Sequence, residues 1–586
     1  MKLDREKIFW RTLGVAVLAL ALMGAAAPFT ATQASTGKHV TIKLGGRVHL
    51  VRSGSVDMSQ LPRATGKGPV VNNRLPTNLS PMTVAQQNAW ALAVKSGKVK
   101  YPQVTQHMLA PKTARPAAKP ANNPNPNFDV CGYTVLPCAS YGYAGLTSTQ
   151  GGGIPYPSTT IGSNPSYVLE GVNAALVVYR FNGTVVSGPV AASSFFASVL
   201  HSSDTMYNPQ VFWDATRLHW IIVMEEAGVN GSGNSVSYLD IAVSKTQNVT
   251  LNPATQYYVY QFQTNEGLGG TAGNWCDNPT LGSDYWGAWI SCNAYDAITN
   301  GFVGNITYGL SKNGLYTDIF SGFYWTNIQA PGVPAPAFNM SPVSEDGTPD
   351  AEFLLATDEG YAVSYDPDLE TCAWANTHAL ANGIAPSLSC VINYILSGYT
   401  EPNYASEPGS SQIIYPGFGA KQLLYKNGTI DFALTTAVSS SQDGVFWAEV
   451  QPQLSGLDPA NPENQTVQTT IARQQGVFAY GDGTDAYMPT YFPSSEDDGV
   501  LVFTLSDSAI YPAFADTGRR ATDALGNMGD GGNWQYIVNS STGGNWGNYS
   551  GCSLDTNLTS RGLIWCGGEY VGSDLWDTRI EGLRVE

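Results

Sequence analysis

The segment Pro209-Gln-Val-Phe-Trp-Asp-Ala-Thr-Arg-Leu-His-Trp220 decides the fold, because it returns in looser form as Pro279-Thr-Leu-Gly-Ser-Asp-Tyr-Trp-Gly-Ala-Trp289. In both segments a proline leads into a strand-like run, a polar turn follows, and aromatic residues occupy the return. Short runs of this kind, rich in Val, Ile, Tyr, Phe and Trp, alternate with Gly, Asn, Asp, Ser and Pro from residue 129 onward. Short strands with regular turn signals predict an all-β sandwich, barrel or propeller.

Length and repetition favour the propeller among these three architectures. A single sandwich usually has about 100 residues, and no linker divides residues 129–586 into several sandwiches. Blade-sized units are expected at roughly 164–200, 205–263, 275–328, 335–417, 420–478, 484–539 and 545–585. The sequence therefore predicts an all-β, seven-bladed β-propeller, with six or eight blades as alternatives.

The first 34 residues are typical of a secretory signal peptide. Four basic residues precede a twelve-residue apolar run, Leu13–Gly24, and alanine-rich sequence follows. This run is well short of the roughly 20 residues that a membrane-spanning helix needs. We expect a secreted or surface-held protein without a transmembrane span in the mature chain.

Residues 35–109 read as a basic arm or a cleaved propeptide, with one helix between Ser80 and Gly97, and residues 110–128 read as a Pro/Ala/Asn linker. Residues 36–128 carry thirteen basic residues and one acidic residue, Asp57, whereas residues 129–586 carry twelve basic and 43 acidic residues. The arm is therefore expected to dock on its own domain or on an acidic cell envelope.

The acidic propeller region is an unfavourable partner for nucleic acid or anionic membranes. In acid the carboxylates of this region become protonated and neutral. Because the region has few basic groups, little positive charge then remains to cause repulsion within the domain. We therefore expect the domain to tolerate an acidic habitat.

Cysteine usage agrees with an oxidising compartment. All eight cysteines follow residue 130, and neighbours in sequence are separated by hairpin lengths. Eight cysteines allow 105 connectivities, of which sequential pairing is the simplest. The predicted disulfides are Cys131–Cys138, Cys276–Cys292, Cys372–Cys390 and Cys552–Cys566.

Several segments in order along the propeller region resemble large secreted bacterial β-propeller proteins of the sialidase-like type, which are mostly uncharacterised. Two turns, Ser311–Gly314 and Ser441–Trp447, resemble degenerate Asp-boxes. The resemblance implies a β-propeller fold and secretion from the cell, but it does not imply a particular reaction. The family's usual acid is replaced at Asn208 and Asn548, and its usual base at Gln210. The matching segments are Asn208–Asp214, Asp277–Gly282, Gly444–Trp447, Tyr491–Ser494, Tyr511–Arg519, Gly547–Ser550, Trp565–Tyr570 and Trp576–Ile580.

Glycoside hydrolysis needs two carboxyl groups across a sugar, or a tyrosine nucleophile with an acid partner. Binding a sugar carboxylate favours arginines, which pair with it in bidentate fashion. Arg519 and Arg579 are the better pocket candidates, because they lie in the matching segments. Structural ion pairs are the competing interpretation. The candidates for acid, base or nucleophile are Glu225, Glu226, Asp277, Glu569 and Tyr570.

A structural Ca²⁺ is a second hypothesis, since acidic loop clusters suit a hard cation. The candidate ligands are Asp346, Asp350, Asp482 and Asp485, but the full EF-hand spacing is missing. Solvated turns are the alternative, and no other cofactor is expected.

No complete catalytic set is evident in the sequence. The leading hypothesis is a monomeric propeller that binds an extracellular glycan or envelope protein without catalysis. The alternative is a sialidase-like glycoside hydrolase with its site at the propeller axis.

Overall fold

A computed structural model describes residues 44–48, 50–57, 109–110 and 137–585. Within the last range it leaves out 155–156, 202–203, 248–255, 266–267, 269–272, 300, 332–335, 347–350, 358–367, 394, 398, 401, 410–418, 456–464, 481–482, 495–496, 529–534, 541–545, 548–549, 557–561 and 573–574. The signal peptide, the helix between Ser80 and Gly97, the linker beyond residue 110, Cys131, Asp350 and Asp482 lie outside the described residues. Of Cys138 and Asp346 only the backbone is described.

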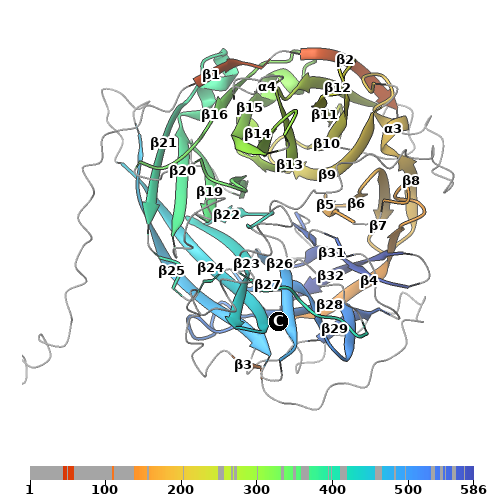
Figure 1. Ribbon diagram of the computed structural model, residues 1–586, viewed down its shortest axis with the longest axis vertical. Helices are drawn as coiled ribbons and strands as arrows, with labels where there is room; N and C mark the ends of the chain where they lie inside the picture. The colour runs from red at the N-terminus through yellow and green to blue at the C-terminus, as the bar shows by residue number, and fades with distance from the viewer. Residues whose placement is uncertain are drawn as a thin grey trace, which may run out of the picture. The chain divides into compact units, whose positions relative to one another are not determined.

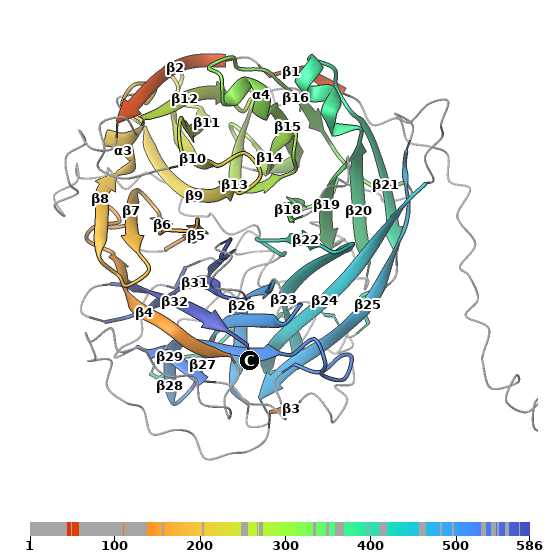
Figure 2. The ribbon, with the colours of Figure 1, turned by 180° about the vertical axis from the view of Figure 1, so that it is seen from behind.

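The described chain is all-β and forms antiparallel sheets arranged as the blades of a propeller (Figures 1 and 2). One blade is β5 (Thr159–Ser163), β6 (Tyr167–Val172), β7 (Ala175–Arg180) and β8 (Val185–Ala191). The next is β9 (Thr205–Asp214), β10 (His219–Val229), β11 (Ser235–Ser244) and β12 (Gln256–Gln263). A third separate sheet contains β17 (Ser341–Pro342), β19 (Ala351–Thr357), β20 (Leu369–Ala375) and β21 (Ser387–Asn393). A fourth contains β26 (Asp485–Pro493), β27 (Gly499–Asp507), β28 (Ile510–Arg519) and β29 (Gln535–Asn539). The fifth contains β30 (Gly551–Leu554), β31 (Ile564–Tyr570), β32 (Asp577–Arg584) and β4 (Cys138–Thr147).

The sixth sheet joins two antiparallel runs. These are β13 (Asn274–Ser283), β14 (Gly287–Asp296), β15 (Phe302–Ser311) and β16 (Gly322–Thr326), and β22 (Leu424–Lys426), β23 (Thr429–Ser439), β24 (Gln442–Leu454) and β25 (Val467–Tyr480). The short strand β18 (Ser344–Asp346) pairs in parallel with both β13 and β22. Hydrogen bonding therefore separates five blades as sheets of their own, where seven were predicted, because β18 merges the two remaining four-stranded runs into the sixth sheet.

The ring is closed by strands from opposite ends of the propeller region. β32 pairs antiparallel with β31 on one side and with β4 on the other, so that Ile580 faces both Gly567 and Tyr143. Figure 2 shows β4 beside β32. Closure of this sheet holds the last strand of the chain against the first strand of the ring.

Strands of the N-terminal arm pair with the propeller. β1 (Leu44–Arg47) adds to β16, β2 (Leu50–Asp57) adds to β12, and β3 (Leu109–Ala110) adds in parallel to β25. Between β1 and β2, Val48 is buried in an apolar cluster with residues of β11, β12 and β15. The segment 44–57 thus lies along the outer edges of two neighbouring four-stranded runs.

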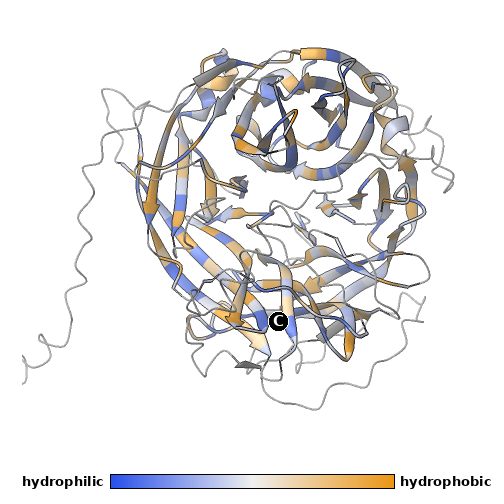
Figure 3. Ribbon diagram, viewed as in Figure 1, coloured by the Kyte–Doolittle hydropathy of each residue, from blue (hydrophilic) through white to orange (hydrophobic). Residues whose placement is uncertain are grey.

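Aromatic side chains fill the space between sheets, which explains most of the tryptophans. Trp289 stacks on Trp374 with 4.6 Å between ring centroids, and Trp213 packs against Trp220 at 5.2 Å. Figure 3 shows apolar stretches along the strands, interrupted by hydrophilic ones. The largest fully buried side chains include Trp220, Trp289, Trp374, Trp447, Trp565 and Trp576.

Three predicted disulfides are confirmed, and each joins two neighbouring strands of one sheet. Cys276–Cys292 links β13 to β14, Cys372–Cys390 links β20 to β21, and Cys552–Cys566 links β30 to β31. Ser311–Gly314, expected as a hairpin turn, instead leads into the short helix α4 (Lys312–Leu315). Within the described part of the chain, no helix is both long and apolar enough to cross a membrane.

Candidate functional site

The first strands of several sheets break at a residue followed by proline. Asn208, Asn278 and Met488 have φ of 49°, 61° and 52°, and each precedes a proline. The pairing register shifts at all three places. Such a bulge inserts an unpaired residue and turns its side chain out of the normal alternation. At Asn208 and Asn278 the bulges bring polar groups of two sheets together.

A cluster of polar side chains joins β9, β10 and β13. Tyr207 Oη donates to Glu225 Oε1 at 2.7 Å. Asn208 Nδ2 lies 3.1 Å from Glu225 Oε2 and 3.4 Å from Asp277 Oδ1, so one amide bridges both carboxyl groups. The backbone N–H of Asn278 donates to Glu225 Oε2 at 3.1 Å. We call Tyr207, Asn208, Glu225 and Asp277 the carboxyl cluster.

Burial controls the protonation of the carboxyl cluster. Burial, followed by the charge of Asp277, raises the pKa of Glu225 well above its usual value. Burial also raises the pKa of Asp277 to about 7, although the Lys421 ammonium opposes the shift. The pKa of Lys421 falls to about 8, mainly through burial. The arrangement holds at least one carboxylic acid proton near neutral pH, as a general acid requires.

Glu225 and Glu226 do not form a pair, although they are adjacent in sequence. Successive side chains of a strand point to opposite faces. Glu225 therefore meets Tyr207 and Asn208, while Glu226 contacts His201 and Gln261 on the other face.

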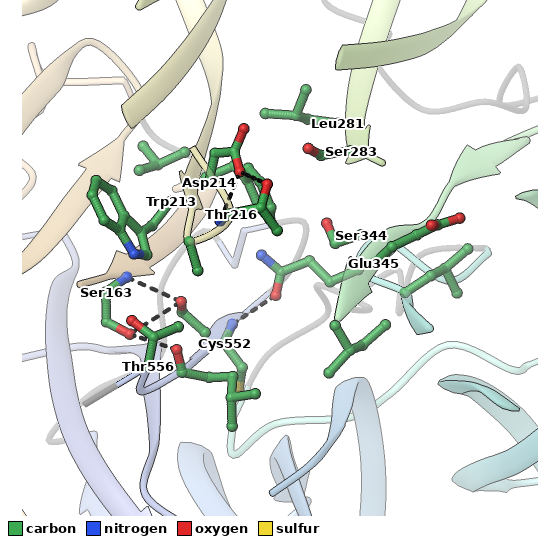
Figure 4. Close-up of a pocket in the computed structure, with 18 of the residues that line it drawn as sticks. Ser163, Trp213, Asp214, Thr216, Leu281, Ser283, Ser344, Glu345, Cys552 and Thr556 are labelled. Carbon is green, nitrogen blue, oxygen red and sulfur yellow. Dashed lines mark hydrogen bonds between the residues drawn. The ribbon is translucent and has the colours of Figure 1, made fainter. Parts of the chain in front are cut away.

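A pocket lies where inner strands of several sheets end, and we call it the axial pocket (Figure 4). It holds about 90 Å³ of space, roughly the room of three water molecules. Its lining combines aromatic and hydrogen-bonding side chains from five of the six sheets. Ser163 Oγ donates to the carbonyl of Leu554 at 3.0 Å, which ties two of these sheets together. Lining residues include Ser163, Gln210, Trp213, Asp214, Tyr285 and Thr556.

Four charged side chains line this pocket, and two of them form an ion pair; the four are Asp214, Asp284, Lys312 and Glu345. Lys312 Nζ lies 2.8 Å from Asp214 Oδ2, and both side chains are almost fully buried. Tyr316 Oη donates to the same oxygen at 2.7 Å. Burial raises the pKa of Asp214, but the charge and hydrogen bond of Lys312, with further hydrogen bonds, bring it below its usual value. The pair therefore adds little net charge to the pocket.

The predicted arginines Arg519 and Arg579 each pair with a different glutamate outside the carboxyl cluster. Arg519 on β28 pairs with Glu449 on β24 at 3.4 Å, and Arg579 pairs with Glu581 on β32 at 2.6 Å. Neither the carboxyl cluster nor the axial pocket contains them. Both pairings match the structural-ion-pair interpretation of these residues.

The remaining predicted residues have local partners. Glu569 Oε2 accepts the backbone N–H of Gly547 at 2.7 Å, and burial raises its pKa well above the usual value. Tyr570 follows at the end of β31. Asp485, the calcium candidate whose side chain is described, accepts backbone N–H groups of Ser406 and Asp443. Calcium binding there stays a prediction.

Sequence reasoning missed Lys421, Tyr207 and the Asp214–Lys312 pair. The repeated Asn-Pro at residues 208–209 and 278–279 is the sequence signal that could have indicated the cluster. Proline inside an inner strand cannot donate to the ladder, so it marks a bulge.

No family model matches the chain, and no curated protein matches it. Similar solved structures include a protein of unknown function from Dyadobacter fermentans, at 12% identity and a TM-score of 0.34, covering 66% of this chain and 96% of that one. The Trypanosoma rangeli sialidase in complex with 2,3-difluorosialic acid has 9% identity and a TM-score of 0.28, covering 70% and 56%. The Hadza microbial sialidase Hz136 has 9% identity and a TM-score of 0.31, covering 71% and 73%. Scores of this size assign neither a family nor an activity.

Proposed function

We propose that this propeller binds an extracellular glycan at the axial pocket. The observation that carries the proposal is the lining itself, in which aromatic faces and hydrogen-bonding groups from several blades converge on one small space. Small-molecule sites combine apolar or aromatic walls with a few placed polar groups. A pocket of about 90 Å³ accepts one substituent of a sugar, while the rest of the glycan lies at its mouth.

Tyr285 is the part of the lining best placed for stacking. It is 39% exposed, and the Arg217 guanidinium lies 4.6 Å from its ring centroid. An aromatic ring held by a cation on one side presents a rigid apolar face to a sugar. The three disulfides favour an oxidising, extracellular setting for such a ligand.

Binding is tested with the full chain on immobilised polysaccharides and a glycan array, followed by titration calorimetry with the best ligand. Tyr285→Ala is expected to weaken binding by roughly tenfold or more, which is the scale of one lost aromatic contact. Tyr258→Ala is the matched control, because Lys245 lies 4.3 Å from its ring centroid in the same kind of pair outside the pocket. Equal loss in both variants, or no glycan retained, contradicts the proposal.

A second candidate function, glycoside hydrolysis, is favoured by the carboxyl cluster. A tyrosine hydrogen-bonded to a glutamate, beside an aspartic acid of pKa about 7, supplies groups that such hydrolases use. We expect Asp277→Asn to abolish any turnover of chromogenic glycosides between pH 3 and 7. Asp485→Asn is the control, because it removes another buried acid of raised pKa, about 6, away from this cluster. Turnover that survives Asp277→Asn excludes this site, and no turnover at all leaves the binding proposal in place.

A further inference from the structure

A second group of convergent side chains lies on the opposite face of the β9–β12 sheet. His201, Asp204 and Glu226 offer an imidazole nitrogen and two carboxylate oxygens that all lie within 4.8 Å of one another. His201 Nδ1 is 2.7 Å from Glu226 Oε1. Ligand atoms about 2.0–2.2 Å from a zinc ion lie roughly 3.5 Å apart, so little movement is needed to close this group around an ion.

A third carboxyl group, that of Asp240, lies behind Glu226. Asp240 is fully buried, and its carboxyl group lies close to the carboxyl group of Glu226 and the side chain of Gln261. Two neighbouring carboxyl groups repel each other when both are ionised, and a cation beside them removes this penalty.

The charge balance among the described residues suits a divalent cation. Three carboxyl groups, those of Asp204, Glu226 and Asp240, gather near one guanidinium, that of Arg52 on β2. Arg52 donates to the carbonyls of Val199 and Leu200 and interacts electrostatically with Asp240. A second positive centre would let all three carboxyl groups ionise together.

The surroundings hold the three side chains in place. Gln261 Nε2 donates to Glu226 Oε2 at 2.7 Å, and the His201 ring stacks on Tyr238 at 4.4 Å. A Cβ at Gly228 would lie 2.1 Å from Asp204 Oδ1, so the glycine makes room for that carboxylate. His201 is about a quarter exposed, which gives an ion access from solvent.

We propose that His201, Asp204 and Glu226 bind one divalent transition metal ion, with Asp240 lying behind Glu226. Mixed imidazole and carboxylate ligands select zinc-like ions over Ca²⁺, which takes an all-oxygen shell. This site differs from the calcium site expected from the sequence in its residues, its place in the fold and its metal.

The test uses the full chain after treatment with a chelator, at pH 7. Zn²⁺ is titrated by calorimetry, and Co²⁺ is titrated by visible absorption as a spectroscopic probe. We expect one equivalent of each metal, d–d bands from bound Co²⁺, and a rise in Tm with Zn²⁺ that Ca²⁺ does not reproduce.

His201→Ala is expected to weaken Zn²⁺ binding by roughly tenfold or more. His378→Ala is the matched control, since His378 lies outside the cluster beside Trp286. Gly228→Ala displaces Asp204 without removing a ligand and should weaken binding as well. No saturable binding at millimolar Zn²⁺, or equal binding by His201→Ala and His378→Ala, overturns the proposal.

Discussion

Glu170 on β6 connects the first blade to the closing strands of the ring, and its proton should make the fold more stable in acid. Its Oε2 accepts the backbone N–H of Leu146 at 3.0 Å and Tyr179 Oη at 3.1 Å. Its Oε1 lies 2.5 Å from Thr578 Oγ1, which is also 3.0 Å from the carbonyl of Leu146. The Thr578 hydroxyl has one proton, so it cannot donate to both Glu170 Oε1 and the carbonyl of Leu146. A protonated Glu170 satisfies the network, because it donates its own proton to Thr578 Oγ1 while Thr578 donates to the carbonyl.

The size of the effect follows from the pKa. Burial raises the pKa of Glu170 from 4.5 to about 7, against the opposing hydrogen bonds. A shift of one unit corresponds to about 1.4 kcal/mol, so the shift amounts to about 3 kcal/mol. Because the folded-state pKa is raised, this contribution is fully present below about pH 4.5. It is lost as the pH rises through 7.

Glu170→Gln isolates this contribution, because glutamine keeps the shape and cannot ionise. We expect equal free energies of unfolding for the two proteins at pH 4. At pH 8 we expect an advantage of up to about 3 kcal/mol for the variant. Urea unfolding at half-unit pH steps from 4 to 8 measures both curves.

Asp296→Asn is the control with the opposite sign. Backbone hydrogen bonds from Thr299 and Ile298 lower the pKa of this exposed carboxyl, so its contribution is present above about pH 3.8 and changes only in stronger acid. Parallel curves for the native chain and Glu170→Gln between pH 4.5 and 7 would refute the reasoning.

Three further changes test other parts of the fold. Lys312→Met leaves Asp214 charged and buried, so we expect the free energy of unfolding to fall by about 3–5 kcal/mol. Adding Asp214→Asn should recover most of this loss. A Lys312→Met variant as stable as the native chain would contradict the pairing. Val48→Asp puts a charge into an apolar cluster, so we expect a lower Tm and faster proteolysis after residue 57. Val51→Asp is the control, because Val51 is exposed, and it should change neither. Replacing both Cys552 and Cys566 with serine should cost about 3 kcal/mol, as a loop of this length predicts; an unchanged denaturation midpoint argues against the link.

The strand pattern of the fold could be predicted because it is local. The unit expected at 205–263 runs from the start of β9 to the end of β12, since alternation and turn residues mark each strand. The number of separate blades could not be predicted in this way. It depends on β18, three residues that pair with two distant strands and carry no periodic signal of their own.

The candidate site shows the same limit. Asp277 and Glu225 were both candidates from residue type, but their meeting depends on a bulge that places Asn208 between them. Strand alternation already implied that Glu226 faces away, once a strand was assigned there. The partners of Lys312 and Glu170 come from other sheets or distant strands, and such long-range pairing leaves no mark in neighbouring sequence.

Pairing of β4 with β32 has a consequence for how the protein is made. During synthesis, β4 is produced more than four hundred residues before its only ladder partner in the described chain. The ring therefore cannot close until the last strand has been delivered, however early the other blades form. The entropy cost of closing a loop rises only weakly with its length, but contacts between residues so far apart in the sequence lower the folding rate. A premature stop that removes residues 577–586 should leave β4 unpaired and the whole ring open, so closure requires synthesis to continue through β32.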